Sequence, residues 1–329
     1  MKFSVLGAGG WGTAIARLLA NAGHETTLWA RDPDRAGAIA RQRENEKYLP
    51  GVRLPDDRLE VTSKLGAGLD ADALFLAVPS FGIDDLLARI AGHVSSPTLV
   101  NLAKGLDRAT HRTASEMIET HLPEACAFSL SGPSHAEEVG RDVPTAVVLA
   151  GRDLERGEWL QHAIATPRFR VYLSEDIRGT ELCAAVKNVI ALATGISDGL
   201  GYGDNSRGAL ITRGLAEMAR FGRALGVRSA TFFGLAGLGD LVATCTSQHS
   251  RNRYVGYRLG AGEPIERILE EMTMVAEGIY ATETVRNMAA ERGIEMPITE
   301  AVSRLLAGEV DPLSLVDEIM TRSPKREDG

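Results

Sequence analysis

The amino-acid sequence predicts an α/β amino-terminal domain, built on a doubly wound and mostly parallel sheet, followed by an all-α carboxy-terminal domain. Two observations predict the first domain. Short, uniformly apolar runs alternate with longer amphipathic runs, and a glycine motif directly follows the first apolar run. A third observation predicts the second domain, because apolar residues recur only at helical spacing from about Ser174 onward. We therefore assign residues 1–173 to the first domain and residues 174–329 to the second.

The apolar runs of the first half are short and bounded by Gly, Pro or polar residues, which is typical of buried strands. Strands are expected at residues 3–6, 26–29, 73–78, 98–102, 125–130, 146–149 and 168–173. The amphipathic runs between them predict helices at residues 13–22, 33–46, 81–91 and 110–121. Strand–helix alternation of this kind places helices on both faces of the sheet.

The second half carries helical patterns at residues 180–194, 209–225, 265–272, 281–291 and 298–306. Gly195, Gly199, Gly201, Gly203 and Gly208 follow the first of these patterns. We expect a mobile loop there instead of regular helix, and the alternative is an ordinary helix–helix connection. The polar segment 322–329 has no apolar partner and is expected to fray.

The composition excludes several function classes. The 329 residues are 44% hydrophobic, which excludes a disordered or fibrous chain, and 36 Lys+Arg against 44 Asp+Glu give a net charge of −8. An acidic chain argues against nucleic acid or an anionic membrane as the main partner, but leaves an anionic small molecule open. No apolar run approaches the roughly 20 residues that span a bilayer, so we expect no stable membrane insertion.

The cysteines and histidines predict a reduced chain without a metal site. Cys126, Cys183 and Cys245 are odd in number, widely spaced and without a C-x-x-C motif, which indicates free thiols and a cytoplasmic location. The seven His residues form no pair at the spacing of metal ligands, so we expect no metal.

The glycine motif predicts a Rossmann-type dinucleotide-binding domain. In the stretch from Gly7 to Gly12 (GAGGWG), Gly7 permits a tight turn, Gly9 lets the backbone approach a pyrophosphate, and Gly12 lets the helix pack on the strand. The free N–H groups of the following helix attract the phosphates. A strand before, a helix after and a second strand at βαβ spacing support this prediction. The alternative is a glycine-rich turn with a structural role only.

The end of the second strand bears on the choice between NAD(H) and NADP(H). An acidic residue there accepts from a ribose 2′-hydroxyl, whereas an arginine pairs with a 2′-phosphate. Arg31 and Asp32 offer both signs, and Arg31 comes first. We expect NADP(H), with NAD(H) also accepted, and the alternative for Arg31 is a solvated loop cation.

Lys187 and Asn188 are candidate catalytic residues. Every residue three or four positions away from either one is apolar, so neither has a polar neighbour on its own helix. A desolvated ammonium has a lowered pKa, which suits a proton donor near neutral pH. The alternative is a lysine whose ammonium reaches solvent at the domain seam, beside a hydrogen-bonded Asn188.

The stretch Ser250–Arg253 (SRNR) is a candidate phosphate site. Ser250 suits a helix N-cap, but two arginines then lie in the first turn, where the helix dipole disfavours cations. A bound phosphate would remove this conflict by contacting Arg251, Asn252 and the free N–H groups. The alternative is an exposed basic turn. Asp240, which follows a glycine pair, is either a helix cap or a site residue.

Together these motifs resemble the bacterial NAD(P)-dependent sn-glycerol-3-phosphate dehydrogenase family over essentially the full length of the chain. Eleven colinear stretches carry the resemblance: GAGGWGTA (7–14), AKGL (103–106), SGPS (131–134), AVKNVIA (185–191), SDGLG (197–201), LITRGLAEM (210–218), GLAGLGD (234–240), TCT (244–246), SRNR (250–253), VAEG (275–278) and MPIT (296–299). A departure is Gly10, where relatives often carry Ser.

The resemblance implies reduction of dihydroxyacetone phosphate to sn-glycerol 3-phosphate by NAD(P)H, with Lys187 as proton donor and acceptor, and a homodimer is expected. Lys187, Asn188 and Asp240 would be the catalytic residues. The substrate would contact Lys104, Gly132, Ser134, Lys187, Asp240, Ser250, Arg251 and Asn252. Beside the glycines of the motif, the cofactor would contact Gly10, Trp11, Arg31, Lys104, Ala136, Arg251, Val275 and Glu277.

Two other functions are compatible with the same pattern. A β-hydroxyacid dehydrogenase of this two-domain architecture also has a Lys near an Asn, but it binds a carboxylate instead of a phosphate. A non-catalytic dinucleotide sensor needs no proton donor and would leave Lys187 and Asp240 unexplained.

Overall fold

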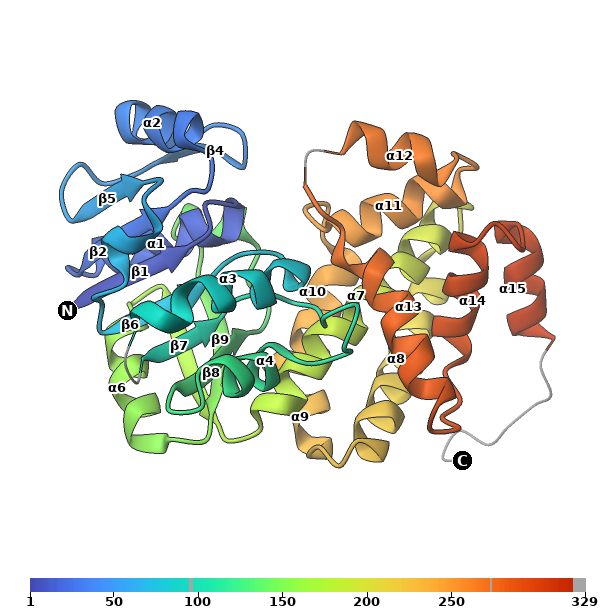
Figure 1. Ribbon diagram of the computed structural model, residues 1–329. Coiled ribbons are helices and arrows are strands. Elements are labelled where there is room, and N and C mark those ends of the chain that lie inside the picture. The colour runs from blue at the N-terminus through green and yellow to red at the C-terminus, as the bar shows by residue number, and fades with distance from the viewer. Residues whose placement is uncertain (95–96, 273, 322–329) are drawn as a thin grey trace.

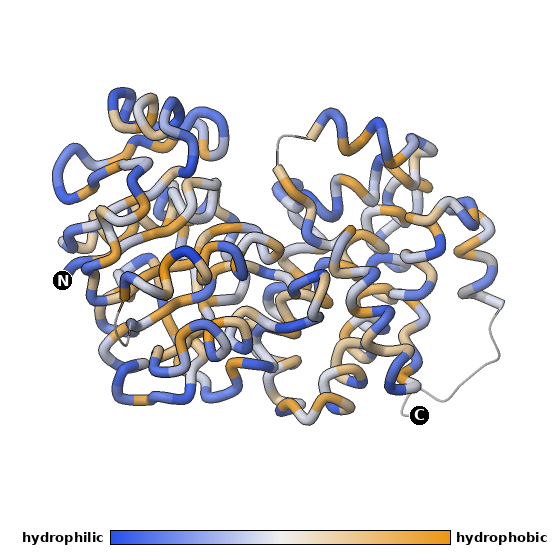
Figure 2. The backbone as a smooth tube through the Cα atoms, in the orientation of Figure 1, coloured by the Kyte–Doolittle hydropathy of each residue, from blue (hydrophilic) through white to orange (hydrophobic). Residues whose placement is uncertain are grey.

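The computed structural model describes residues 1–94, 97–272 and 274–321, so the segment 322–329 that is expected to fray lies outside the described residues. Strands gather in the amino-terminal part, and helices make up the carboxy-terminal part (Figure 1). In Figure 2, hydrophobic segments run through the sheet and the interior of the helical part, whereas the outer turns are mostly hydrophilic. The fold class predicted from the sequence is confirmed.

An eight-stranded sheet forms the amino-terminal part, in the order β10-β9-β8-β7-β6-β1-β2-β5. Its strands are β1 (Lys2–Leu6), β2 (Glu25–Trp29), β5 (Leu59–Thr62), β6 (Ala73–Leu76), β7 (Thr98–Asn101), β8 (Cys126–Ser131), β9 (Thr145–Gly151) and β10 (Phe169–Ser174). Neighbouring strands pair in parallel, except β8 with β9. The strand order reverses between β1 and β6, which is where sheets of this kind bind ligands at the carboxyl ends of their strands.

Helices cover both faces of this sheet, because successive side chains of a strand point to opposite sides. On β6, Phe75 belongs to one hydrophobic cluster with Ile15, whereas Leu74 belongs to another with Leu86 and Ile118. The helices of this part are α1 (Gly10–Asn21), α2 (Pro33–Gln42), α3 (Ile83–Ile90), α4 (Ala114–His121), α5 (Ala136–Gly140) and α6 (Leu154–Ile164). Short 3-10 turns lie at Leu65–Gly68, Ser80–Gly82 and Ala91–His93.

The segment after α2 differs from the sequence prediction. The expected helix over 33–46 stops at Gln42, since Arg43 adopts a left-handed conformation with φ 53° and a hairpin of β3 (Glu44–Asn45) and β4 (Leu49–Arg53) follows. Asn45 in this hairpin donates to the carbonyl of Ala8 and to Thr13 Oγ1. The hairpin is thus fixed by contacts with the distant first helix, which no local pattern reveals.

The carboxy-terminal part packs its helices around α7. The helices are α7 (Ile177–Gly199), α8 (Asp204–Ala224), α9 (Ser229–Phe233), α10 (Asp240–Thr246), α11 (Arg251–Gly260), α12 (Ile265–Glu271), α13 (Glu277–Ala290), α14 (Pro297–Leu306) and α15 (Pro312–Met320), with a π turn at Leu235–Gly239. Helix α7 contacts α8, α10, α11, α13 and α14, and it is buried on all sides from Gly179 to Ser197.

The expected mobile loop between Gly195 and Gly208 is wrong. Helix α7 continues to Gly199 and α8 begins at Asp204, so residues 200–203 alone connect them. The first two glycines are needed for packing on α11. A Cβ atom on Gly195 would lie 2.1 Å from the carbonyl oxygen of Arg253, and one on Gly199 would lie 2.1 Å from that of Tyr257. Glycine here permits close approach of two helix backbones.

Helix α7 qualifies the sequence-based statement that no apolar run is long enough to span a bilayer. By length and composition this helix could cross a membrane, because the polar residues Glu181, Lys187 and Asn188 do not offset its apolar majority. Its most apolar window of 18 residues is completely buried inside the fold, as is usual for a core helix.

Candidate active site

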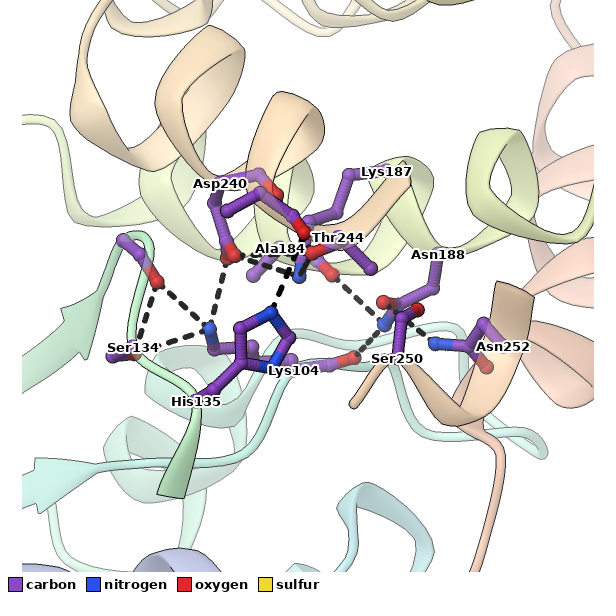
Figure 3. Close-up of polar contacts among 12 residues, drawn as sticks. Lys104, Ser134, His135, Ala184, Lys187, Asn188, Asp240, Thr244, Ser250 and Asn252 are labelled. Atoms are coloured by element: carbon purple, nitrogen blue, oxygen red, sulfur yellow. Dashed lines mark hydrogen bonds and ion pairs between the residues drawn. The ribbon is translucent and has the colours of Figure 1, made fainter. Parts of the chain in front are cut away.

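Lys187 lies in the middle of α7 and is only 3% exposed. Its Nζ donates to Asp240 Oδ1 at 2.8 Å and to Thr244 Oγ1 at 2.6 Å (Figure 3). Both partners belong to α10, since the neighbours of Lys187 on its own helix are apolar. Burial lowers the pKa of Lys187 to about 8, although the negative charge of Asp240 acts in the opposite direction. The ammonium can therefore release and regain a proton near neutral pH.

Asp240 joins two lysines that come from different parts of the chain. Its Oδ2 accepts from Lys104 Nζ at 2.9 Å, while its Oδ1 accepts from Lys187. Burial alone would raise the pKa of Asp240, but the two ammonium groups outweigh it and lower the pKa below its ordinary value. Gly239 occupies the N-cap position of α10, so Asp240 is not a helix cap.

Lys104 follows β7 and reaches the site from the sheet. Its Nζ also donates to the carbonyl of Gly132 at 2.9 Å and to Ser134 Oγ at 3.3 Å, both just beyond β8 (Figure 3). The structure therefore brings together three residues that the resemblance assigns to the substrate. The neighbouring His135 has a pKa lowered by burial, and its Nε2 lies 3.4 Å from the carbonyl oxygen of Ala243.

Asn188 and Asn252 form a chain of buried amides beside the lysines. Asn188 Nδ2 donates to the carbonyl of Lys104 at 2.9 Å, and its Oδ1 accepts from Asn252 Nδ2 at 2.9 Å. Asn252 Oδ1 accepts in turn from the backbone N–H of Gly278. Asn188 is therefore hydrogen-bonded as its structural alternative expected, but two of its partners, the backbone of Lys104 and the side chain of Asn252, belong to the predicted site.

The two arginines at the start of α11, Arg251 and Arg253, have different environments. Ser250 caps the helix, with its Oγ accepting from the N–H of Arg253 at 3.2 Å. Arg253 pairs through Nε with Asp198, whose side chain is 5% exposed, at 2.7 Å, so a carboxylate already stabilises this cation. Arg251 remains exposed at the first helical position, and its Nη1 donates to the carbonyl of Val275. The conflict with the helix dipole is thus confined to Arg251.

The glycine motif forms an open cradle after β1. Gly7 has φ +132°, and a Cβ there would lie 2.5 Å from the carbonyl oxygen of Ala77; a Cβ on Gly12 would lie 2.0 Å from that of Gly7. A Cβ on Gly9, by contrast, would meet nothing within 4 Å. Gly9 is the N-cap of α1, where no side chain caps the helix and no acidic residue occupies the first turn. The end of α1 is therefore open to an anion.

The other expected cofactor residues lie around this cradle and along the seam. A Cβ on Gly10 would approach Ala136 Cβ to 3.5 Å, and would clash at 2.7 Å with the carbonyl oxygen of Tyr48, so a Ser at this position would require a shift of the hairpin. The indole Nε1 of Trp11 is buried and has no hydrogen-bond partner within residues 1–94, 97–272 and 274–321. Glu277 accepts from the N–H and the Oγ of Ser80, at 3.0 and 2.7 Å. An open helix end and an unpaired buried N–H fit a dinucleotide.

Arg31 and Asp32 have different roles at the end of β2. Asp32 Oδ1 accepts from the backbone N–H groups of Asp34 and Arg35, at 2.9 and 3.2 Å, and so caps α2. The hydrogen bond from Arg35 contributes most to lowering the pKa of Asp32. Arg31 is exposed. Asp32 therefore serves to cap the helix, whereas Arg31 has no hydrogen-bond or ion-pair partner among the described residues.

The sequence analysis missed Thr244, Asn101 and Glu181. Thr244 lies four residues after Asp240, one helical turn further along, which places both side chains on one face. Glu181 lies seven residues before Asn188, about two turns along α7, so these two polar side chains also share a face of an apolar helix. This spacing is the signal that could have identified Glu181.

Two family models match the chain. The model described as NAD-dependent glycerol-3-phosphate dehydrogenase N-terminus covers residues 2–156, and the model for the C-terminus covers residues 176–317. Glycerol-3-phosphate dehydrogenase (NAD(P)+) of Geobacillus kaustophilus is 47% identical over 331 residues, covering 99% of this chain and 96% of that protein. The corresponding protein of Desulfitobacterium hafniense is 44% identical over 327 residues, covering 99% and 93%. The crystal structure of glycerol-3-phosphate dehydrogenase from Coxiella burnetii has a TM-score of 0.94 at 39% identity, covering 98% of this chain and 99% of that one.

Proposed function

Because this chain belongs to the NAD-dependent glycerol-3-phosphate dehydrogenase family, we propose that the seam around Asp240 is its active site and that Lys187 is the proton donor and acceptor. The protein is an NAD(P)-dependent oxidoreductase that reduces dihydroxyacetone phosphate to sn-glycerol 3-phosphate, a precursor of glycerophospholipids. The observation that carries the assignment of Lys187 is its buried ammonium, held by Asp240 and Thr244.

The side chains at the seam fit proton transfer to a ketone oxygen. When bound, the reduced nicotinamide supplies the hydride for C2 of the substrate. Lys187 stabilises the negative charge that develops on the C2 oxygen and donates a proton to it. Asp240 keeps the buried ammonium protonated and, with Thr244, fixes its position. In the reverse direction the neutral amine of Lys187 accepts the proton from the hydroxyl.

Two further groups complete the proposed catalytic and substrate site. Lys104, with Gly132 and Ser134, supplies a second cation beside the reacting oxygen. Asn188 holds the backbone of Lys104 and belongs to the catalytic set with Lys187 and Asp240. This arrangement is supported by the shared carboxylate, since Asp240 neutralises part of the charge of both lysines.

The substrate phosphate is assigned to the start of α11. Arg251, an exposed residue, offers a guanidinium, and the first turn of this helix, capped by Ser250, offers backbone N–H groups next to Asn252. Arginine and helix N–H groups both favour a phosphate. Binding of the phosphate at this position would orient the substrate carbonyl toward Lys187.

The dinucleotide is assigned to the cradle after β1 and to the seam. The open end of α1 suits the pyrophosphate, and Arg31 suits a 2′-phosphate, which favours NADP(H) while NAD(H) is also accepted. The proposed contacts are Gly7, Gly9, Gly10, Trp11, Gly12, Arg31, Lys104, Ala136, Arg251, Val275 and Glu277.

The assay that tests this function follows NADPH oxidation with dihydroxyacetone phosphate, and repeats it with NADH. Turnover with this ketone and none with β-keto acids supports the proposal. Activity on a hydroxyacid but none on dihydroxyacetone phosphate would favour a β-hydroxyacid dehydrogenase. Tight NADPH binding without any turnover would favour a dinucleotide sensor.

We further propose a homodimer that works in the cytoplasm, without stable membrane insertion and without nucleic acid, and with its domain boundary near residues 173–174, at the end of β10. The net charge of −8, the free thiols of Cys126, Cys183 and Cys245, and the complete burial of the apolar window of α7 support this view. Light scattering of the purified protein tests the dimer, because a mass of one chain would contradict it.

A further inference from the structure

Glu181 is a buried carboxylate near the beginning of α7, and it is only 2% exposed. It accepts hydrogen bonds from the amino-terminal domain. Ser115 donates with its N–H to Oε1 and Oε2, at 3.2 and 3.3 Å, and with its Oγ to Oε2 at 2.6 Å. Asn101 Nδ2 donates to Oε1 at 3.1 Å. Burial raises the pKa of Glu181 to about 7. A buried carboxylate that relies on neutral donors is costly, so its presence at a domain seam calls for a function.

Asn101 links Glu181 to the loop that carries Lys104. This asparagine ends β7, and its Oδ1 accepts from the N–H of Ala103 at 2.9 Å. Its Nδ2 donates to the carbonyl of Ala103 at 3.2 Å as well as to Glu181. The side chain of Asn101 therefore fixes both backbone groups of the residue that precedes Lys104.

Helix α7 holds the same loop at a second point. Asn188, about two turns beyond Glu181 on the same face, donates to the carbonyl of Lys104. Lys187, the neighbour of Asn188 in sequence, shares the carboxylate of Asp240 with Lys104. One helix thus carries Lys187, Asn188, which holds the loop of Lys104 directly, and Glu181, which holds it through Asn101.

We propose that Glu181 is a positioning residue: by orienting Asn101 it fixes the backbone of Ala103, and so sets the place of Lys104 against Asp240 and Lys187. This inference rests on the proposed function, since it concerns the geometry of that reaction. Glu181 itself does not touch the substrate site, and its effect passes through the loop.

Two substitutions separate hydrogen bonding from filling of space. In Glu181→Gln, the amide oxygen can still accept from Asn101 and from the N–H of Ser115, while the amide nitrogen donates to Ser115 Oγ. Glu181→Leu fills a similar volume but offers no acceptor, so Asn101 loses its bond to Glu181 and is held only by Ala103 and by Ser129 Oγ. If the leucine variant does not fold, Asn101→Ala is used in its place, because it removes the side chain that bonds the backbone of Ala103.

Glu217 on α8 provides a matched control. This carboxylate is 1% exposed, and burial raises its pKa as well. It accepts from the N–H groups of Ile298 and Thr299, at 2.8 and 2.9 Å, and from Thr299 Oγ1 at 2.7 Å. Its partners belong to α14 and not to the loop of Lys104. Glu217→Leu therefore removes a comparable buried network elsewhere.

The experiment measures kcat, KM for dihydroxyacetone phosphate, the Kd of NADPH and Tm for wild type and these variants. Wild-type turnover is established first, because its absence would contradict the proposed function and not this inference. We expect Glu181→Leu and Asn101→Ala to lower kcat by about 10²-fold, as a displacement near 1 Å can do, with only a small rise in the Kd of NADPH, because Lys104 is one of several proposed cofactor contacts. Glu181→Gln should retain kcat close to wild type, and Glu217→Leu should lower Tm without lowering kcat.

Three outcomes would overturn the inference. Wild-type kcat in a folded Glu181→Leu or Asn101→Ala variant would show that the loop keeps its place without Glu181. An equal loss of kcat in Glu217→Leu would indicate general destabilisation. A loss of kcat in Glu181→Gln as large as in Glu181→Leu would show that the hydrogen bond to Asn101 does not determine kcat.

Discussion

Lys104 and Lys187 approach the same carboxylate from different domains, one on each oxygen of Asp240, at 2.9 and 2.8 Å. Two ammonium groups around one buried carboxylate leave a net positive charge at the seam. A site of this kind favours an oxygen that becomes negative during the reaction. The charge of Lys187 also changes near neutral pH, because burial lowers its pKa to about 8.

The first prediction concerns pH. Reduction requires the proton on Lys187, so kcat/KM should fall as pH rises through about 8, and oxidation of glycerol 3-phosphate should rise through the same pH. In Asp240→Asn the attraction that favours the ammonium is lost, which lowers the pKa of Lys187 further. The falling limb should then move to lower pH, and the rate should drop at every pH. A limb that stays in place in this variant would mean that another group titrates.

The second prediction concerns Arg31. Because Asp32 caps α2, Arg31 is the charged side chain at the end of β2 that has no partner in the part of the chain that the structure describes. Arg31→Ala should weaken NADPH binding by about tenfold and leave NADH binding nearly unchanged, since NADPH alone carries the 2′-phosphate. Fluorescence titration with both cofactors measures this. An equal loss for both would assign Arg31 to the adenine or to the loop.

The third prediction compares two glycines of the cradle. Gly12→Ala places a Cβ 2.0 Å from the carbonyl oxygen of Gly7, so it should destabilise the fold by about 1–3 kcal/mol. Gly9→Ala meets nothing within 4 Å and keeps an allowed backbone, so Tm should hold while cofactor affinity falls. Thermal unfolding with and without NADPH distinguishes the two. Unchanged NADPH affinity in Gly9→Ala would contradict the proposed pyrophosphate position.

The fourth prediction concerns Arg251. Its removal costs one hydrogen bond to the carbonyl of Val275 and relieves an unfavourable interaction with the dipole of α11, so Tm should change little. Loss of a charged phosphate contact should lower kcat/KM for dihydroxyacetone phosphate by about 10²-fold, through both KM and kcat. Some loss of NADPH affinity is also expected, because the residue is assigned to both ligands. A variant that melts far below wild type would mark Arg251 as structural.

The sequence predicted the fold class and most strands, because buried parallel strands appear as short apolar runs whose position needs no distant partner. It also selected Lys187, because the apolar neighbours on its own helix show that the ammonium is desolvated. Its hydrogen-bond partners could not be predicted, since Asp240 and Thr244 come from another helix and Lys104 from another domain. The pairing of Arg253 with Asp198 likewise depends on how α11 packs against α7.

The errors have a common physical cause. The glycines after Lys187 were assigned to a loop because glycine weakens isolated helices, yet Gly195 and Gly199 lie in α7 where the backbone of α11 touches it. Similarly, the end of α2 depends on Arg43, which bonds the carbonyls of Pro55 and Leu59. In both cases tertiary contacts override a local preference, and the sequence alone does not display them.

The most direct test of the account is the turnover of Lys187→Ala with NADPH and dihydroxyacetone phosphate, together with its Tm and its Kd for NADPH. If Lys187 is the proton donor, kcat should fall by about 10³-fold or more, while the variant stays folded and binds NADPH as wild type does. Near-normal turnover in a folded variant would contradict the assignment of Lys187 and, with it, the proposed mechanism.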